Sequence, residues 1–441
     1  MMKLMKKWLG KCSLIVVALF SVSAPAKQLK VEPGDVSIIL PSVKPGILVG
    51  ADADTLSESH GLDAFFSELE KLRNGQDTVV NIVHLGDSHI QAGYYSGEIM
   101  RLMQAAFGCA GRGWIAPLKI SKTNEPDDYV ISSSIKKWSV GRCTQAKPRA
   151  PWGLGGMGLE TTSPSVDFDV IVTPRNGRGY GFNKVVQYRA ATSMPMLPAS
   201  PYKEITSIHR DSSHLSMNFV ADTFLLSQKT DTFTLHSTRR KIGSDVLLPS
   251  SEFRNVYYGF SLENGHRGVL YHAIGCNGGM FVNYTKEQFV WQLSLLKPSL
   301  LIISMGTNES FGRNFRTGEF SRQIESFLDL VKKYMPNTAI LLTTPPECFK
   351  RKYVNKKRLY VRNSNIELVA STIKSVAEKQ NLACWDLFTA TGGKNSCEKW
   401  RDDGLMGKDY LHFTTEGYRE QGKLLFRALM KEYMLSIYKN N

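Results

Sequence analysis

Short apolar runs and amphipathic stretches alternate along the first part of the chain. Between residues 62 and 72, leucine and phenylalanine recur at steps of three and four, which predicts a helix. Residues 79–85 form a short, mostly apolar run that ends at Gly86, as a buried parallel strand would. Residues 94–107 show helical spacing again and are followed by a glycine. The pattern therefore predicts helix, strand, turn and helix in that order.

The same rhythm returns in the last third of the chain, where apolar strands alternate with amphipathic helices. The strands are predicted at residues 300–305, 339–343 and 382–387, and the helices at residues 320–334, 363–379 and 415–433. Strands that alternate with helices are typical of a parallel sheet covered by helices on both faces. The sequence therefore predicts an α/β fold with three layers, α/β/α.

Residues 120–265, between these halves, have a different character. They are rich in serine, threonine, glycine and aromatic residues, and polar and apolar positions alternate in residues 166–172 and 232–236. Alternation with a period of two predicts antiparallel strands, and therefore a β-sandwich inserted into the α/β fold. Four aromatic residues of the insert are either sandwich core or, if exposed, a platform for sugar rings. They are Trp138, Trp152, Tyr180 and Tyr188.

The N-terminus has the pattern of an export signal. Four lysines accompany an apolar stretch at residues 13–20, and the small residues Ala24 and Ala26 follow it. This order predicts a secretory signal peptide at residues 1–26, followed by an extended segment at residues 27–56. The alternative is an uncleaved N-terminal anchor. No later run approaches the roughly 20 apolar residues that cross a bilayer, so we expect no membrane span after cleavage.

The chain is basic, with 55 lysines and arginines against 40 aspartates and glutamates, a formal net charge of +15. Removal of the four signal-peptide lysines would lower this charge to +11. A basic surface favours polyanionic partners. Because we find no nucleic-acid-binding signature, we expect a polymer of the cell envelope rather than nucleic acid. The densest basic run, residues 350–358, is interpreted as a solvated face rather than a binding site.

Six of the seven cysteines lie beyond the predicted signal peptide, and an even number permits disulfides in an exported protein. Cys109 with Cys143 and Cys384 with Cys397 are the local candidates among 15 connectivities. No cysteines and histidines are spaced closely enough for a zinc site. We therefore expect no metal and no cofactor.

The first candidate for chemistry is Ser88, which lies in Gly86-Asp87-Ser88-His89 between the first predicted strand and the helix after it. A tight turn there would lift the hydroxyl out of the sheet and aim backbone N–H groups at it, as a nucleophile needs. The same residues are also an ordinary turn and helix cap, so the motif alone is weak. We interpret Asp87 as a cap and His89 as a structural histidine.

Two residues near the C-terminus could complete a triad. Asp409 and His412 are three positions apart, so one helical turn would point both side chains the same way. His412 would take the proton of Ser88, and Asp409 would hold the imidazole tautomer. Asp402 and Asp403 could compete with Asp409, but no histidine follows either of them at that spacing.

Two glycine-containing segments could supply an oxyanion hole. Gly306-Thr307-Asn308 directly follows the strand at residues 300–305, at the edge of an α/β sheet where ligands bind. An asparagine there can donate its side-chain N–H to a developing oxyanion. Asn277-Gly278-Gly279 offers backbone N–H groups after the apolar run at residues 269–274.

Taken together, four short motifs occur in the order of the four blocks of the SGNH (GDSL) hydrolases, which the chain resembles. The motifs are Gly86-Asp87-Ser88, Gly278, Gly306-Thr307-Asn308 and Asp409-Tyr410-Leu411-His412. The resemblance implies that Ser88 is the nucleophile and Asp409 and His412 the acid–base pair. It also implies that Ser88, Gly278 and Asn308 form the oxyanion hole. Gly275 and Gly279 are alternatives to Gly278.

Ser88 and Gly278 are 190 positions apart, whereas a simple SGNH enzyme leaves a few dozen residues between these blocks. From about residue 75 to 430 the chain resembles bacterial peptidoglycan O-acetylesterases, in which a module like a family-35 carbohydrate-binding module interrupts the hydrolase domain. This resemblance implies a hydrolase domain at residues 57–119 and 266–441 and an insert at residues 120–265.

The same resemblance implies a function. We expect a serine esterase in the periplasm of a Gram-negative bacterium that removes O-acetyl groups from a cell-wall glycan, above all the 6-O-acetyl group of N-acetylmuramic acid in peptidoglycan. One alternative is an O-acetyltransferase or an acetylesterase for another polysaccharide, because the same triad serves both reactions. The other is a non-catalytic glycan-binding protein of the envelope.

Overall fold

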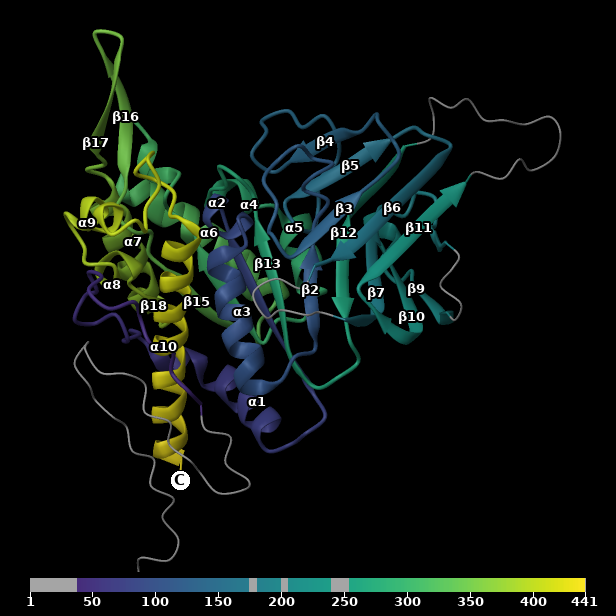
Figure 1. Ribbon diagram of the computed structural model, residues 1–441, viewed down its shortest axis with the longest axis horizontal. Coiled ribbons are helices and arrows are strands. Elements are labelled where there is room, and N and C mark those ends of the chain that lie inside the picture. The colour runs from purple at the N-terminus through teal and green to yellow at the C-terminus, as the bar shows by residue number, and fades with distance from the viewer. Residues whose placement is uncertain (1–37, 174–180, 200–204, 239–253, 441) are drawn as a thin grey trace, which may run out of the picture.

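The computed structural model describes residues 38–173, 181–199, 205–238 and 254–440 (Figure 1). The predicted signal peptide and residues 27–37 of the segment after it lie outside the described residues, as does Tyr180. Among the helices that are described, none combines the length and the hydropathy of a membrane span.

A parallel sheet of five strands lies at the centre of the α/β part, in the order β13-β1-β14-β15-β18. Its strands are β1 (Val79–Gly86), β13 (Gly268–Gly275), β14 (Leu300–Ser304), β15 (Ala339–Thr343) and β18 (Ala383–Trp385). Helices cover both faces, which is why these strands read as apolar runs without alternation. Val83, Leu301 and Leu341, on three neighbouring strands, have no exposed surface.

Two groups of helices form the outer layers. Helices α1 (Asp63–Arg73), α3 (Tyr94–Phe107) and α10 (Thr415–Asn440) pack together through Tyr433, whose ring lies 5.8 Å from Phe66 and 5.4 Å from Phe107. Figure 1 shows α3 and α10 in front of the sheet, with α6 (Thr317–Tyr334) behind it. The three-layer prediction is confirmed.

The remaining helices of the α/β part are shorter or lie beside α6. They are η1 (Ser59–Leu62), α2 (Ser88–Gln91), α4 (Phe281–Tyr284), α5 (Glu287–Ser294), η4 (Glu309–Phe311), α7 (Ile366–Lys379), α8 (Leu387–Ala390) and α9 (Ser396–Asp402). A separate hairpin, β16 (Phe349–Val354) and β17 (Lys357–Arg362), contains the basic run at residues 350–358 that the sequence indicated to be a solvated face.

The antiparallel strands form two further sheets. One contains β4 (Ser139–Arg142), β5 (Met157–Thr161), β12 (Asn255–Glu263), β7 (Phe182–Arg189), β10 (Val220–Thr230), β9 (Ile205–Asp211) and β2 (Gly111–Ile115). The other contains β3 (Tyr129–Ser132), β6 (Ser165–Val172), β11 (Thr232–Thr238) and β8 (Leu197–Pro198), and η2 (Leu215–Met217) precedes β10. Because β2 pairs with β12, antiparallel pairing starts at Gly111, before residue 120.

The two antiparallel sheets pack face to face through aromatic rings. Phe168 of β6 lies 5.3 Å from Tyr257 and 5.7 Å from Phe260, both on β12. Phe233 of β11 lies 5.9 Å from Phe224 of β10. The predicted β-sandwich between the two parts of the α/β fold is therefore present.

Aromatic residues that could have formed a sugar platform contribute to packing instead. The Trp138 ring stacks on Phe168 at 5.5 Å, and the Tyr188 ring lies 5.8 Å from Trp114. Trp152 packs against Phe289 of α5, at 5.9 Å. Tyr188 is buried, as the core alternative expects, whereas Trp138 and Trp152 are half-buried and pack against the core.

Candidate active site

Ser88 lies at the first position of α2, directly after β1, at the carboxyl edge of the parallel sheet. The turn needs a glycine at position 86, because a Cβ atom there would approach Ile90 Cγ1 to 2.3 Å and the Ser304 carbonyl oxygen to 2.7 Å. Asp87 caps the helix, since its Oδ1 accepts the His89 N–H at 2.9 Å. The capping role predicted for Asp87 is confirmed.

The structure brings Ser88, His412 and Asp409 together. Ser88 Oγ lies 3.0 Å from His412 Nε2, and His412 Nδ1 lies 2.7 Å from Asp409 Oδ2. Ser88 and His412 are 324 positions apart in the chain. These are the contacts that a nucleophile, its base and the orienting carboxylate require.

Asp409 and His412 do not share a helical turn, contrary to the sequence expectation. They lie in a loop before α10 in which Tyr410 has a φ of 55°, in the left-handed region. Asp409 Oδ1 accepts the N–H groups of Leu411 at 3.1 Å and of His412 at 3.0 Å. This turn, closed by an aspartate side chain, brings the carboxylate back to the imidazole.

The electrostatics of this pair suit a base at His412. Partial burial alone would raise the pKa of Asp409, but hydrogen bonds from the His412 ring and from the backbone of His412 and Leu411 lower that pKa to about 2. The hydrogen bond to Asp409 in turn raises the pKa of His412, against partial burial. With the ionised carboxylate holding the proton on Nδ1, the Nε2 lone pair faces the Ser88 hydroxyl.

Asn308 lies beyond β14, and its side chain connects two of the predicted blocks. Its Nδ2 donates to Asp87 Oδ2 at 3.1 Å and to the Gly279 carbonyl oxygen at 3.0 Å. Both amide hydrogens are therefore used within the protein. Asn308 can donate to an oxyanion only by sharing or releasing one of them.

Gly278 is the best placed of the three candidate glycines. Gly275 lies within the β1–β13 ladder, and the Gly279 N–H already donates to the Cys276 carbonyl oxygen at 2.8 Å. Gly278 is exposed with a φ of 79°, and its N–H donates to no acceptor in the part of the chain that the structure describes. Of the three glycines, Gly278 is thus the one whose N–H can donate a hydrogen bond to a ligand.

Two buried carboxyl groups hold these segments in place. Burial raises the pKa of Asp87 to about 7, and it raises that of Glu309 to about 7 as well. Glu309 Oε1 accepts the N–H of Phe281 at 2.8 Å, which joins the segment after Asn308 to α4. The sequence placed Glu309 directly after the Gly306-Thr307-Asn308 motif but carried no signal for its partner.

The residues around Ser88 are fixed by further buried contacts. His84 of β1 lies 2.7 Å from the Tyr271 hydroxyl through Nδ1 and 2.7 Å from Ser304 Oγ through Nε2, so it connects three strands. His89 lies 2.8 Å from the Tyr418 hydroxyl through Nδ1. Burial lowers the pKa of each histidine to about 3, so both are neutral. His89 therefore has the structural role that was predicted.

Gln91 is a residue near the site that sequence reasoning missed. Its Oε1 accepts the Asn277 N–H at 2.9 Å, and its Nε2 donates to Thr123 Oγ1 at 2.9 Å and to Asn124 Oδ1 at 2.8 Å. The Asn277 side chain donates to the same Asn124 oxygen at 2.7 Å. This cluster ties the segment that leads into the sandwich to the loop that carries Gly278.

No disulfide joins the described cysteines, so neither of the two local pairs expected from the sequence is a disulfide in this structure. The thiols of Cys143 and Cys276 form a hydrogen bond with each other, next to the loop that carries Gly278. Cys109 instead donates to the Gly111 carbonyl oxygen, and Cys397 contacts Met406. All six described cysteines carry free thiols.

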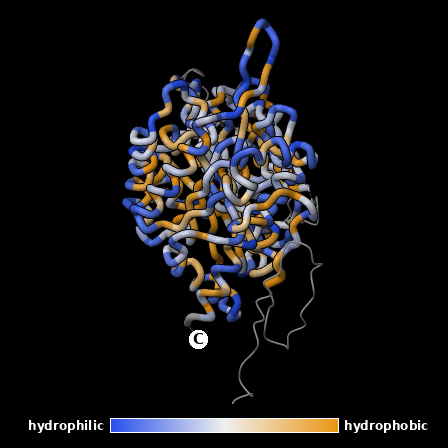
Figure 2. Tube along the Cα trace, turned by 90° about the vertical axis from the view of Figure 1, so that its left-hand side faces the viewer, coloured by the Kyte–Doolittle hydropathy of each residue, from blue (hydrophilic) through white to orange (hydrophobic). Residues whose placement is uncertain are grey.

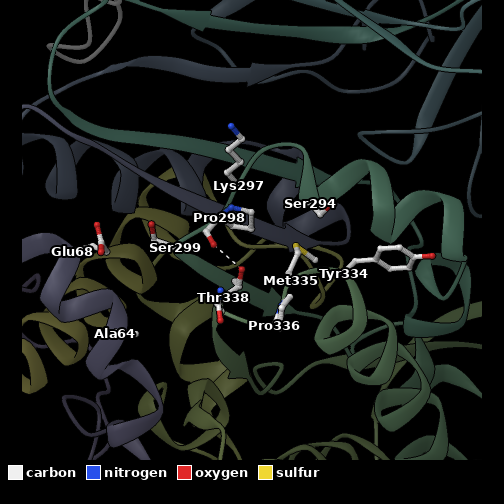
Figure 3. A pocket seen from close by; sticks show the side chains of 11 residues that line it. Ala64, Glu68, Ser294, Lys297, Pro298, Ser299, Tyr334, Met335, Pro336 and Thr338 are labelled. Carbon is white, nitrogen blue, oxygen red and sulfur yellow. Dashed lines mark hydrogen bonds between the residues drawn. The ribbon is translucent and has the colours of Figure 1, made fainter. Parts of the chain in front are cut away.

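A hollow of about 460 Å³ lies at the other edge of the sheet. Figure 3 shows Pro298, Ser299 and Thr338 lining it, with the Thr338 hydroxyl donating to the Pro298 carbonyl oxygen at 2.7 Å. These residues precede β14 and β15, whereas Ser88 follows β1. The hollow is therefore at the amino edge of the sheet and separate from the triad.

Comparisons with known proteins agree with this site. Residues 252–420, which include Gly278, Asn308, Asp409 and His412, match the model of the GDSL-like Lipase/Acylhydrolase family. No curated protein matches the chain by sequence.

One solved structure shares the fold over most of the chain, and smaller ones align with about a third of it. A peptidoglycan O-acetylesterase aligns with 84% of this chain and 96% of its own, at a TM-score of 0.66 and 18% identity. A lipase/acylhydrolase from Enterococcus faecalis (20% identity, TM-score 0.26) covers 37% of this chain and 75% of its own. A carbohydrate esterase family 3 protein from Talaromyces cellulolyticus (14% identity, TM-score 0.29) covers 37% and 72%.

The family match covers three of the four blocks, and the structure places Ser88 of the remaining block against His412. The α/β fold that carries them is shared with a solved esterase over most of the chain. Residues 252–420 thus resemble the GDSL-like Lipase/Acylhydrolase family, and together with the contacts among Ser88, His412 and Asp409 they identify a carboxylic ester hydrolase.

Proposed function

We propose that this hydrolase removes O-acetyl groups from a cell-wall glycan, namely the 6-O-acetyl group of N-acetylmuramic acid in peptidoglycan. The observation that carries the esterase chemistry is the hydrogen-bonded chain from Ser88 Oγ through His412 to Asp409. The substrate rests on the likeness in fold to a peptidoglycan O-acetylesterase over 84% of the chain.

The reaction would proceed in two halves. Ser88 Oγ attacks the acetyl carbonyl carbon while His412 Nε2 takes the hydroxyl proton, and the carbonyl oxygen becomes an oxyanion. When the intermediate collapses, His412 returns the proton to the departing sugar 6-oxygen, and an acetyl group remains on Ser88. Water, deprotonated by His412, then attacks the acetyl-enzyme, and His412 returns this proton to Ser88 Oγ as acetate leaves. Asp409 stays ionised throughout.

The oxyanion would be held by the N–H groups of Ser88 and Gly278 and by the side chain of Asn308. The Ser88 N–H starts a helix and so has no acceptor within it. The loop of Gly278 is held by Gln91 and Asn308, so its backbone is fixed before an ester arrives. Donors fixed in advance cost no reorganisation during the reaction.

The location and the layout are parts of the same proposal. Export to the periplasm is supported by the signal-peptide pattern of residues 1–26, and the basic composition suits an acidic polymer. We place the hydrolase domain at residues 57–119 and 266–441 and a carbohydrate-binding-module-like insert at residues 120–265.

The test is acetate release from purified O-acetylated peptidoglycan, with acetylated xylan as a second substrate. Ser88→Ala should release no acetate, whereas Ser371→Ala, an exposed serine on α7, should match the parent. Hydrolysis of xylan without hydrolysis of peptidoglycan would contradict the substrate. Acetyl transfer to an added sugar acceptor would identify a transferase, and glycan binding without turnover of an aryl acetate would identify a binding protein.

A further inference from the structure

The hairpin of β16 and β17 projects from the body of the protein. Figure 1 shows it rising beyond the helices at the edge of the sheet where α2 begins, and Figure 2 shows it clear of the body from a second direction. Its two strands are joined by Asn355 and Lys356, which have φ values of 50° and 61°. Two left-handed residues make the tight turn that suits the twist of a hairpin.

The hairpin carries a high density of positive charge. Residues 349–362 include seven lysines and arginines and no aspartate or glutamate. Within the described chain, Arg362 is the one of these seven that forms an ion pair, at 3.0 Å to Glu347. Lys352, Lys357 and Arg358 are exposed. Their charges repel one another, so the arm is suited to an anionic partner.

The cross-strand pairs show a second regularity, because every pair joins one cation to one apolar or aromatic residue. The six pairs are Phe349 with Arg362, Lys350 with Val361, Arg351 with Tyr360, Lys352 with Leu359, Tyr353 with Arg358, and Val354 with Lys357. Both faces of the ribbon therefore present charges beside apolar groups. Tyr353 is 65% exposed, and the Arg351 guanidinium lies 5.7 Å from its ring centre.

The base of the hairpin packs against the loop of the triad. The Tyr410 ring lies 5.1 Å from the Phe349 ring and 5.1 Å from the Tyr360 ring, and the Phe349 N–H donates to the Tyr410 carbonyl oxygen at 2.9 Å. Tyr410 lies between Asp409 and His412 in sequence. The hairpin therefore starts at the loop that carries His412.

We propose that this hairpin binds the carboxylate-bearing glycan polymer whose ester reaches Ser88. The inference rests on the proposed function for the identity of the polymer. Lysine and arginine pair with carboxylates, and the exposed ring of Tyr353 offers a flat surface to a sugar. A solvated face, as the sequence indicated, would need neither the alternation of cations with apolar groups nor a place beside the triad.

A lipid surface is the competing partner for a basic hairpin. Insertion into a bilayer favours apolar residues at the deepest point. Here the turn that ends the hairpin is Asn355-Lys356, and Lys357 follows it. The end of the arm is thus polar and charged, which favours a hydrated polyanion.

Binding without turnover tests the proposal. In a Ser88→Ala background, cosedimentation with purified peptidoglycan sacculi should be about tenfold weaker for Lys352→Gln/Lys357→Gln/Arg358→Gln than for the parent at low salt. The difference should shrink as salt screens the charges, over a Debye length of about 10 Å at 0.1 M. A charge-retaining variant, Lys352→Arg/Lys357→Arg/Arg358→Lys, should bind as the parent does.

A matched control removes three exposed lysines elsewhere, with Lys71→Gln/Lys332→Gln/Lys379→Gln, and should keep its binding. Sacculi whose carboxylates have been amidated should bind the parent and the hairpin variant equally. Equal binding of all variants to untreated sacculi would overturn the proposal. So would a loss confined to anionic phospholipid vesicles, which would assign the hairpin to a membrane. Acetate release plays no part in this assay, so failure of the proposed esterase activity would leave its result standing.

Discussion

Replacement of Asn308 by alanine tests how the oxyanion donors are held. If Asn308 stabilises the oxyanion, Asn308→Ala should lower kcat for an aryl acetate by about 10²–10³-fold, or about 2.7–4 kcal/mol, with little change in KM. The same change removes the donor to Asp87 and to the Gly279 carbonyl oxygen. Because Asp87 is buried, the lost hydrogen bonds should also lower the free energy of unfolding by about 1–3 kcal/mol.

The two effects differ in their pH dependence. Burial raises the pKa of Asp87 to about 7 from the ordinary 3.8, so the unfolded state loses this proton first as the pH rises. The contribution of Asp87 to the free energy of unfolding therefore falls between these two pH values. Without the Asn308 donor, the pKa of Asp87 rises further, and this contribution continues to fall above pH 7.

The assay combines initial rates with denaturant unfolding at about pH 6 and about pH 8. The stability lost in Asn308→Ala should be larger at the higher pH, whereas Asn337→Ala, an exposed asparagine at the opposite edge of the sheet, should change neither rate nor stability. A folded Asn308→Ala protein with kcat within about threefold of the parent would refute a role in oxyanion stabilisation.

Three further predictions concern the triad and the sandwich. Ser88→Ala should lower kcat by about 10⁴–10⁶-fold at unchanged Tm, and retained turnover would identify another nucleophile. Because Asp409 raises the pKa of His412, the acid limb of the pH profile of kcat/KM should lie above pH 6.5. Asp409→Asn should move this limb to lower pH and reduce kcat about 10⁴-fold. A limb below pH 6.5 in the parent would contradict the assigned base. In the sandwich, Asp222 accepts hydrogen bonds from buried Arg189 and from Arg210, each at 2.6 Å. Asp222→Ala should therefore lower the free energy of unfolding by about 3–5 kcal/mol in denaturant. Breaking the more exposed Glu325–Lys379 pair by Glu325→Ala should lower it by less than about 1 kcal/mol.

Much of the α/β fold could be predicted because its signals are local. The helix expected at residues 94–107 has those bounds, since glycines with positive φ lie on both sides of it. The strands of the parallel sheet are apolar runs because both of their faces are buried. The β16–β17 hairpin was missed because cations interrupt its strand pattern, and Phe349 and Tyr360 find their partner, Tyr410, far along the chain.

The candidate site divides in the same way. Ser88, Asp409 and His412 could be named from short motifs, but the turn that carries the last two could not, because its geometry depends on the left-handed Tyr410. The ties that hold the site are long-range. Asn308 reaches Asp87 across 221 positions, and the Asn277 backbone reaches Gln91 across 186, so spacing along the chain carries no trace of either contact.

These ties also explain how one site can be built from segments that the sandwich separates. The Asn308 side chain links Asp87, next to Ser88, to the Gly279 carbonyl oxygen. Glu309, the next residue, accepts the N–H of Phe281 and so links the same segment to α4. The Glu309 contact is buried and the two Asn308 contacts are partly buried, so each is costly to leave unmade and helps to fix the position of both partners. The amide that would stabilise an oxyanion is thus also a structural crosslink. A loss of activity in Asn308→Ala must therefore be compared with the pH dependence of stability. Displacement of the Asp87 turn would lower both kcat and the free energy of unfolding, the latter more at high pH, whereas loss of an oxyanion donor lowers kcat at every pH.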